Sequence, residues 1–172
     1  MRPWIFTLLL CFSSVPALAG PKDTVELSGR VCVEDANTLY VGGMRRKQGC
    51  EGGDPVRLRG ADAPDLDQSC TSLDGREWYC GRAAAANLLE LVKNQDIRCQ
   101  GTEKDRHGRL LAVCWKGKMD IAREMVRLGW AMADREERTY RTEESNAHIA
   151  ALGLWQGKFD DPTDWRLRRG RR

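Results

Sequence analysis

One ten-residue stretch, residues 56–65, constrains this chain more than any other. It reads VRLRGADAPD: a short apolar strand carrying Arg57, then a turn that holds Asp62 and Asp65 three residues apart. Pro64 stiffens the turn, because proline fixes its own φ and drives the residue before it towards extended geometry. An arginine can bind a phosphate through two parallel hydrogen bonds, one acid can hold a hard metal ion, and another can orient a water molecule. The stretch therefore predicts a rigid strand end suited to phosphodiester chemistry.

The first 19 residues have the pattern of an export signal. Arg2 precedes an apolar run over residues 4–12, and Ala17-Leu18-Ala19 is a small-x-small cleavage site. The apolar run is far shorter than the ~20 residues needed to span a bilayer, so a cleaved signal peptide is favoured over the alternative, a membrane anchor. We therefore expect a secreted or periplasmic monomer, with one domain over residues 20–165 and no membrane attachment after cleavage.

Six of the seven cysteines lie beyond the predicted signal, an even number that argues for three disulfides in an exported chain. Their number alone permits many connectivities. The plausible local pairings are Cys70–Cys80 and Cys99–Cys114, which leave Cys32–Cys50. A zinc site is the alternative, but the chain has no Cys-x-x-Cys, and both histidines lie away from the cysteines. Disulfides are therefore the prediction.

The charge of the chain is unevenly distributed, because five arginines crowd residues 166–172. Without these and Arg2, the body has 22 basic and 25 acidic residues. The domain is thus not a general basic clamp for nucleic acid, and attraction to polyanions is expected in the tail or in a cleft. Residues 166–172 themselves are expected to form a disordered, solvated tail.

Hydrophobic periodicity predicts five strands and three helices. The strands are expected over residues 24–35, 38–41, 56–58, 96–101 and 109–115, and the helices over residues 81–93, 120–129 and 143–152. Asp120 is the expected N-cap of the second helix, and Gly153 is expected at the end of the third. Loops are expected over residues 44–55 and 66–79. This order fits an α+β fold, a five-stranded Greek-key barrel of the OB type, whose face commonly binds oligonucleotides or oligosaccharides.

The stretch 56–65 resembles the signature of the staphylococcal-nuclease-like (thermonuclease-like) family, whose usual form is R-L-x-G-I-D-A-P-E. Gly108-Arg109 after Asp105 resembles the D-x-x-G-R motif of the family. Residues 126–131 and 153–155 resemble its helical signatures, and Trp165-Arg166 resembles its usual ending. The resemblance covers residues 29–166 and implies the OB barrel with this helix order.

The resemblance also implies a calcium-dependent phosphodiesterase site. Arg57 and Arg109 would contact the phosphate, and Asp65 would stand where the water-orienting glutamate of the family lies. Asp62, the carbonyl of Ala63 and Asn37 would hold Ca²⁺, a cation that takes several oxygen ligands.

Two residues depart from the family pattern. Asn37 replaces an aspartate in the D-G-D-T turn, which removes one negative charge, and Asp65 is one methylene shorter than glutamate. Since a misplacement of about 1 Å can cost on the order of a hundredfold in rate, the two changes together predict a slow or inactive enzyme. The plain alternatives are that Arg57 lies on a solvated strand face and that Asn37, Asp62 and Asp65 are turn formers.

Arg106 and His107 lie in the charged turn before Arg109 and are candidate substrate-binding residues; solvent exposure is the alternative for His107. Two functions follow. The first is an exported calcium-dependent nuclease acting on nucleic acid, with single-stranded DNA or RNA as the expected substrate. The second is a catalytically silent module that binds a polyanion. Some members of the family are associated with exopolysaccharide production, so the polyanion could also be an acidic sugar polymer.

Overall fold

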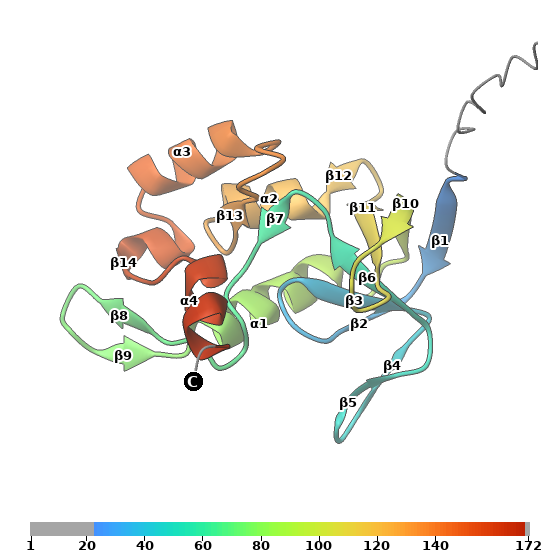
Figure 1. Ribbon diagram of the computed structural model, residues 1–172, viewed down its shortest axis with the longest axis horizontal. Coiled ribbons are helices and arrows are strands. Elements are labelled where there is room, and N and C mark those ends of the chain that lie inside the picture. The colour runs from blue at the N-terminus through green and yellow to red at the C-terminus, as the bar shows by residue number, and fades with distance from the viewer. Residues whose placement is uncertain (1–22, 171–172) are drawn as a thin grey trace, which may run out of the picture.

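The computed structural model describes residues 23–170, with a curled sheet on one side and helices on the other (Figure 1). The predicted signal peptide lies outside the described residues, as do Arg171 and Arg172. No helix in the described range is both long enough and apolar enough to cross a bilayer.

The main sheet follows the strand order β1-β10-β11-β6-β3-β2, with β12 added to β11. Its strands are β1 (Val25–Gly29), β2 (Val31–Val33), β3 (Thr38–Val41), β6 (Asp54–Leu58), β10 (Ile97–Lys104), β11 (Leu110–Lys116) and β12 (Met119–Asp120). The two ends of this path, β1 and β2, are consecutive in the chain and separated only by Arg30. The single strand predicted over residues 24–35 is therefore a strand broken at Gly29, whose φ of +148° suits glycine. Its halves pair with β10 and β3, so the sheet curls back to its start.

The register between strands confirms the predicted OB-type α+β fold. β6 and β11 run parallel, with Leu111 opposite Arg57, whereas β3 runs antiparallel to β6, with Thr38 opposite Arg57. These pairings place Arg57 of β6 between Thr38 of β3 and Leu111 of β11.

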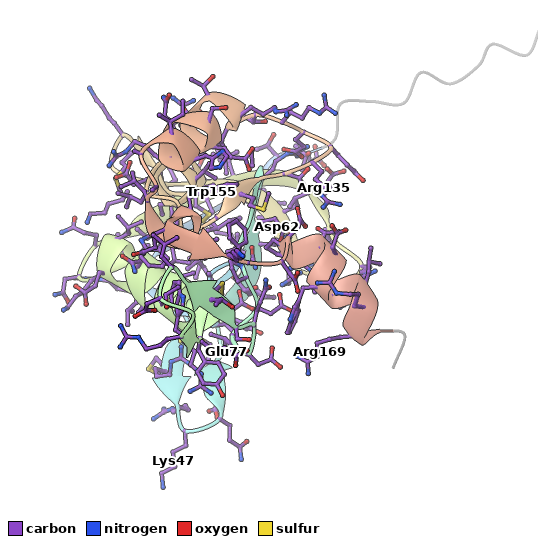
Figure 2. The ribbon with its side chains drawn as sticks, turned by 90° about the vertical axis from the view of Figure 1, so that its left-hand side faces the viewer. Lys47, Asp62, Glu77, Arg135, Trp155 and Arg169 are labelled. Atoms are coloured by element: carbon purple, nitrogen blue, oxygen red, sulfur yellow. A yellow bond between two sulfur atoms is a disulfide. The ribbon has the colours of Figure 1, made fainter. Side chains whose placement is uncertain are left out.

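The two predicted loops contain short strands that the hydrophobic pattern did not indicate. The first forms the hairpin β4 (Met44–Arg46) and β5 (Gly49–Glu51), which projects from the body with Lys47 at its tip (Figures 1 and 2). The second contains β8 (Cys70–Ser72) and β9 (Glu77–Trp78), joined by β14 (Gly157–Lys158).

The three predicted helices are present as α1 (Cys80–Val92), α2 (Ile121–Arg127) and α3 (Arg141–Ile149), followed by a short 3₁₀ helix over Gly153–Gln156. The Asp120 side chain accepts a hydrogen bond from the Arg123 N–H, which confirms it as the N-cap of α2. Gly153 does not end α3 as expected: α3 ends at Ile149 with Ala150 as its C-cap, Ala151 takes the positive φ of 49° after it, and Gly153, with a φ of 55°, begins the 3₁₀ helix.

A fourth helix, α4 (Pro162–Arg169), was not predicted. Residues 166–169 were expected to be disordered, and the structure places them in this helix instead. The physical reason is local: the Asp161 side chain accepts hydrogen bonds from the N–H groups of Thr163 and Asp164, and Pro162 occupies the first turn, where no N–H is needed.

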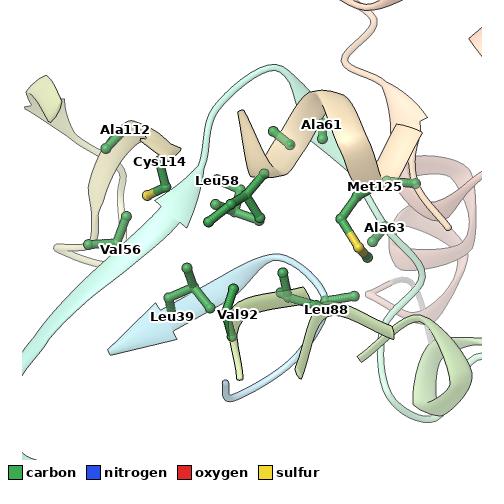
Figure 3. Close-up of a cluster of buried hydrophobic side chains, with 14 of the residues drawn as sticks. Leu39, Val56, Leu58, Ala61, Ala63, Leu88, Val92, Ala112, Cys114 and Met125 are labelled. Carbon is green, nitrogen blue, oxygen red and sulfur yellow. The ribbon is translucent and has the colours of Figure 1, made fainter. Parts of the chain in front are cut away.

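The hydrophobic core lies between the sheet and the helices. Leu39, Val56 and Leu58 from the sheet face Leu88 of α1 and Met125 of α2, and all five side chains are buried (Figure 3). Burial of large apolar side chains is the main stabilising contribution to such a core.

All three predicted disulfides form: Cys32–Cys50, Cys70–Cys80 and Cys99–Cys114. Three disulfides are typical of proteins in an oxidising extracellular or periplasmic environment.

Candidate nucleic-acid cleavage site

The residues predicted to carry chemistry surround one cleft of about 790 Å³. Those at its wall are Asn37, Arg57, Asp65, Arg106, His107 and Arg109. Asp62 and Ala63 lie behind this surface, with 7% and 0% of their area exposed. Six further charged residues of the wall were not predicted as site residues: Asp35, Asp105, Asp134, Glu136, Glu137 and Arg166.

Arg57 reaches the cleft from β6, the strand that ends at the acid-bearing turn. Its Nη2 donates to Asp62 Oδ1 at 3.0 Å, and both side chains are largely buried. Among the described residues this is the only hydrogen bond of the Arg57 guanidinium, so its other N–H groups are available to a phosphate.

Arg109 stands immediately before β11 and is held in one orientation from two sides. Its Nε and Nη2 donate to Asp105 Oδ2 at 2.8 and 2.7 Å, and its Nη1 donates to Thr38 Oγ1 at 2.8 Å. Asp105 Oδ1 accepts from the backbone N–H groups of His107 and Arg109, which shapes the turn between β10 and β11. Burial alone would raise the pKa of Asp105, but these hydrogen bonds outweigh it and the pKa lies below its ordinary value.

Asn37 and Ala63 bind each other. The N–H of Ala63 donates to Asn37 Oδ1 at 2.8 Å, and Asn37 Nδ2 donates to the carbonyl of Ala63 at 2.9 Å. Both residues are buried. The two oxygens proposed as metal ligands therefore already accept hydrogen bonds, and the amide of Asn37 fits the role of a structural residue that fixes the turn before Pro64.

Arg166, on α4, binds both acids of the turn. Its Nη2 lies 2.5 Å from Asp62 Oδ2, and its Nη1 lies 3.0 Å from Asp65 Oδ1. Thr163, one turn earlier on α4, donates its hydroxyl to Asp62 Oδ2 at 2.9 Å. The predicted site did not include Arg166, because α4 itself was not predicted. The Asp161-Pro162 pair, a typical helix start, was the signal in the sequence that could have found it.

The environment of Asp65 shifts its proton affinity. Burial raises the pKa of Asp65 above its ordinary value, the carboxylates of Asp35 and Asp62 act in the same direction, and the hydrogen bond and charge of Arg166 oppose them. A carboxylate with a raised pKa is a better proton acceptor near neutral pH, as a general base requires.

Arg106 and His107 lie next to each other at the mouth of the cleft. Arg106 Nε donates to His107 Nε2 at 3.1 Å, and both side chains are exposed. Their position fits contact with a bound substrate, and it fits solvation equally well.

The cleft has more acids than arginines. Six carboxylates and four guanidinium groups are among its wall residues. General electrostatic attraction therefore does not draw a polyanion into this cleft, and any phosphate must be held by directed hydrogen bonds from individual arginines.

The acids can hold a cation, as their contacts with Arg166 show. Within residues 23–170, no three His, Cys, Asp or Glu side chains are grouped as a metal site. The carboxylates of Asp62 and Asp65 nevertheless converge on one cationic group, the guanidinium of Arg166. Two carboxylates that face one point are suitable donors for a hard cation such as Ca²⁺, so these two residues fit calcium once that guanidinium is elsewhere.

The fold and the site together define a small OB-type barrel that presents Arg57, Arg109 and Asp65 at one cleft. Comparison with known families agrees, since residues 55–157 match the family model described as staphylococcal nuclease homologue. The chain belongs to this family.

Similar proteins of low identity include two named as endonucleases and one named for polysaccharide biosynthesis. An uncharacterized endonuclease of Haemophilus influenzae is 29% identical over 164 residues, which cover 93% of this chain and 82% of that protein. The succinoglycan biosynthesis protein ExoI of Rhizobium meliloti is 28% identical over 76% of this chain and 65% of its own length. A probable endonuclease LCL3 of Pyricularia oryzae is 29% identical over 66% of this chain and 49% of its own length.

Proposed function

We propose that this protein is an exported, calcium-dependent nuclease that acts as a monomer on single-stranded DNA or RNA. The observation that carries the proposal is that Arg57, on β6, and Arg109, directly before the adjacent β11, line one cleft together with Asp65. The endonuclease names of two relatives support the reaction class. Export is supported by the three disulfides and by the signal-like pattern of residues 1–19.

Each residue has a chemical task in phosphodiester hydrolysis. Arg57 binds the phosphate with its available N–H groups, and Arg109, held by Asp105 and Thr38, stabilises negative charge as it develops on the phosphoryl oxygens. Asp65 orients the attacking water and takes its proton as the new P–O bond forms. The bond from phosphorus to the leaving oxygen breaks, and solvent protonates that oxygen.

Calcium, when bound by Asp62 and Asp65, would add positive charge beside the phosphate. Asn37 would contribute only through the backbone of Ala63, which it holds in place. The short Asp65 side chain and the neutral Asn37 support a rate below that of a site with the full set of acids.

The test is hydrolysis of single-stranded DNA and RNA with and without calcium, by the wild type and by Arg57→Ala and Arg109→Ala. Each substitution should reduce the rate on the order of 10²-fold or more, because an electrostatic contact to the transition state is lost. Arg30→Ala is the matched control: Arg30 is exposed, pairs with Asp96 and does not line the cleft. Equal residual rates in all three variants would rule out the proposed site.

A second function is favoured by Arg166, whose guanidinium already occupies the two acids that calcium would need: a catalytically silent module that binds a polyanion through the arginines of the cleft. The succinoglycan biosynthesis name of one relative extends this candidate to an acidic polysaccharide. Such a module would bind its ligand in a salt-sensitive manner without turnover. Calcium-dependent cleavage that disappears in Arg57→Ala would exclude it.

A further inference from the structure

The C-terminal helix α4 inserts a positive charge between the two acids of the candidate site. Arg166 forms hydrogen bonds with Asp62 at 2.5 Å and with Asp65 at 3.0 Å. The other oxygen of Asp62 is bound by Arg57. Thus the acids that fit calcium already have a cation between them, and it belongs to the chain itself.

A divalent cation and Arg166 cannot occupy this position together. An ion within bonding distance of both carboxylates would stand at contact distance from the guanidinium, and like charges at that separation repel strongly in a partly buried site. The side chain of Arg166 therefore has to move away from the two carboxylates before the ion can bind.

The attachment of α4 allows such a displacement. Pro162 is its only buried residue, while Leu167 is 53% exposed. The helix is otherwise held by polar contacts at the surface, including Arg135 with Asp161 and Asp164 and Arg169 with Asp67. Exposed ion pairs of this kind are individually weak, and moving the helix end would expose little of the core.

We propose that Arg166 and calcium compete for the Asp62–Asp65 pair, so that the affinity of Arg166 for these acids sets the calcium concentration at which the site loads. The inference rests on the proposed function for the identity of the ion. It adds that α4 loosens when calcium binds and that removal of the guanidinium strengthens calcium binding.

The first experiment is calorimetric titration of calcium into the wild type, Arg166→Gln and Arg168→Gln. Glutamine keeps much of the length and polarity of arginine without the charge. Arg166→Gln should bind calcium at least tenfold more tightly than the wild type. Arg168→Gln, the matched control, should bind like the wild type, because Arg168 lies on the same helix, is half exposed and pairs with Asp160.

The second experiment measures hydrogen exchange of the amides of residues 165–170 in the wild type with and without calcium. Exchange should accelerate at a calcium concentration that saturates the site, since α4 loses its contact with the acids. This measurement does not depend on any variant, so it decides the question even if Arg166→Gln fails to fold.

Two results would overturn the proposal: equal calcium affinity of Arg166→Gln and the wild type, including no binding by either, or exchange of α4 that saturating calcium leaves unchanged. Neither readout involves cleavage. A protein that binds calcium competitively but cuts no nucleic acid would therefore refute the proposed function and leave this inference standing.

Discussion

At the scale of single residues, the departure at Asn37 has a structural explanation. An asparagine can donate and accept at once, and Asn37 uses both capacities on the backbone of Ala63. An aspartate, as in the family pattern, could accept from the N–H but could not donate to the carbonyl. Asn37 thus lacks the negative charge that would strengthen a metal site, but its two hydrogen bonds stabilise the turn that carries Asp62.

Substitution of Asn37 should therefore destabilise the fold even without calcium. Asn37→Ala leaves the buried N–H and C=O of Ala63 unpaired, and we expect a loss on the order of 3 kcal/mol; Asn37→Asp should lose about 2 kcal/mol. Urea unfolding in the presence of a chelator measures both. Asn87→Ala, which removes a partly exposed helical asparagine, should change stability much less. An Asn37→Asp protein as stable as the wild type would show that the amide is not a structural clamp.

The Asp105–Arg109 pair predicts a pH dependence of stability. Because the pKa of Asp105 is lowered from its ordinary 3.8, the unfolded chain binds the proton more readily than the folded protein does. The stabilisation by this pair is therefore complete above about pH 4 to 5 and is lost as the pH falls through the lowered pKa. Asp105→Asn should lower the unfolding free energy by about 2 kcal/mol at pH 7 and by much less near pH 2.

Urea unfolding of both proteins at the two pH values checks this prediction. Asp74→Asn is the control, because the pKa of Asp74 is also lowered, by Arg76 and Ser72, but at a fully exposed position. Its effect should be small at both pH values. A loss in Asp105→Asn that is equal at pH 7 and pH 2 would contradict the assignment.

At the scale of secondary-structure elements, α1 supports the turn that holds Asp65. Gly81, in the first turn of α1, packs directly on this turn: an added Cβ would lie 1.7 Å from the carbonyl oxygen of Asp65. No side chain fits there unless the helix or the turn moves. The close contact links the start of a helix to the position of the proposed general base.

Gly81→Ala should therefore cost about 1–3 kcal/mol through overpacking and should also slow cleavage, because it displaces Asp65. Thermal unfolding and the single-stranded DNA assay measure the two effects. Gly170→Ala is the matched control, since its added Cβ would meet its nearest neighbour at an ordinary 3.6 Å and its φ of −66° suits alanine. Equal behaviour of the two variants would mean that the turn adapts to α1 freely.

The secondary-structure elements also differ in how well the sequence predicts them. Apolar periodicity located α1, α2 and most strands of the barrel because these elements bury apolar side chains, whereas α3 buries only Ala147. The parallel register of β6 and β11, which brings Arg57 close to the strand of Arg109, followed from the OB fold and not from periodicity. α4 escaped because it docks through arginines and aspartates, which look in sequence like a solvated tail. The engagement of Asp62 by Arg166 escaped with it, since the two lie 104 positions apart.

At the scale of the whole molecule, two of the disulfides support different parts of the structure, and only one of them lies beside an element that contacts the turn of Asp65. Cys32–Cys50 ties β5 of the projecting hairpin to β2, and the tip of that hairpin lies well away from Asp62 (Figure 2). Cys70–Cys80 instead joins β8 to the first residue of α1, next to Gly81. The two bonds join cysteines 18 and 10 positions apart. Because the entropy of a closed loop depends only on the logarithm of its length, both bonds are assigned similar contributions of about 2–4 kcal/mol each.

Removing each bond should therefore affect stability similarly and function differently. Cys32→Ala/Cys50→Ala should lower the unfolding temperature by several degrees and leave the calcium affinity and cleavage close to those of the wild type. Cys70→Ala/Cys80→Ala should lower the unfolding temperature by a similar amount. It should also weaken calcium binding and slow cleavage, because the start of α1 no longer holds the turn of Asp65 firmly. Calorimetric unfolding, calcium titration and the cleavage assay on the two proteins separate the effects. If both variants lose function in proportion to stability, the cleft depends on the fold as a whole, and the specific support from α1 is refuted.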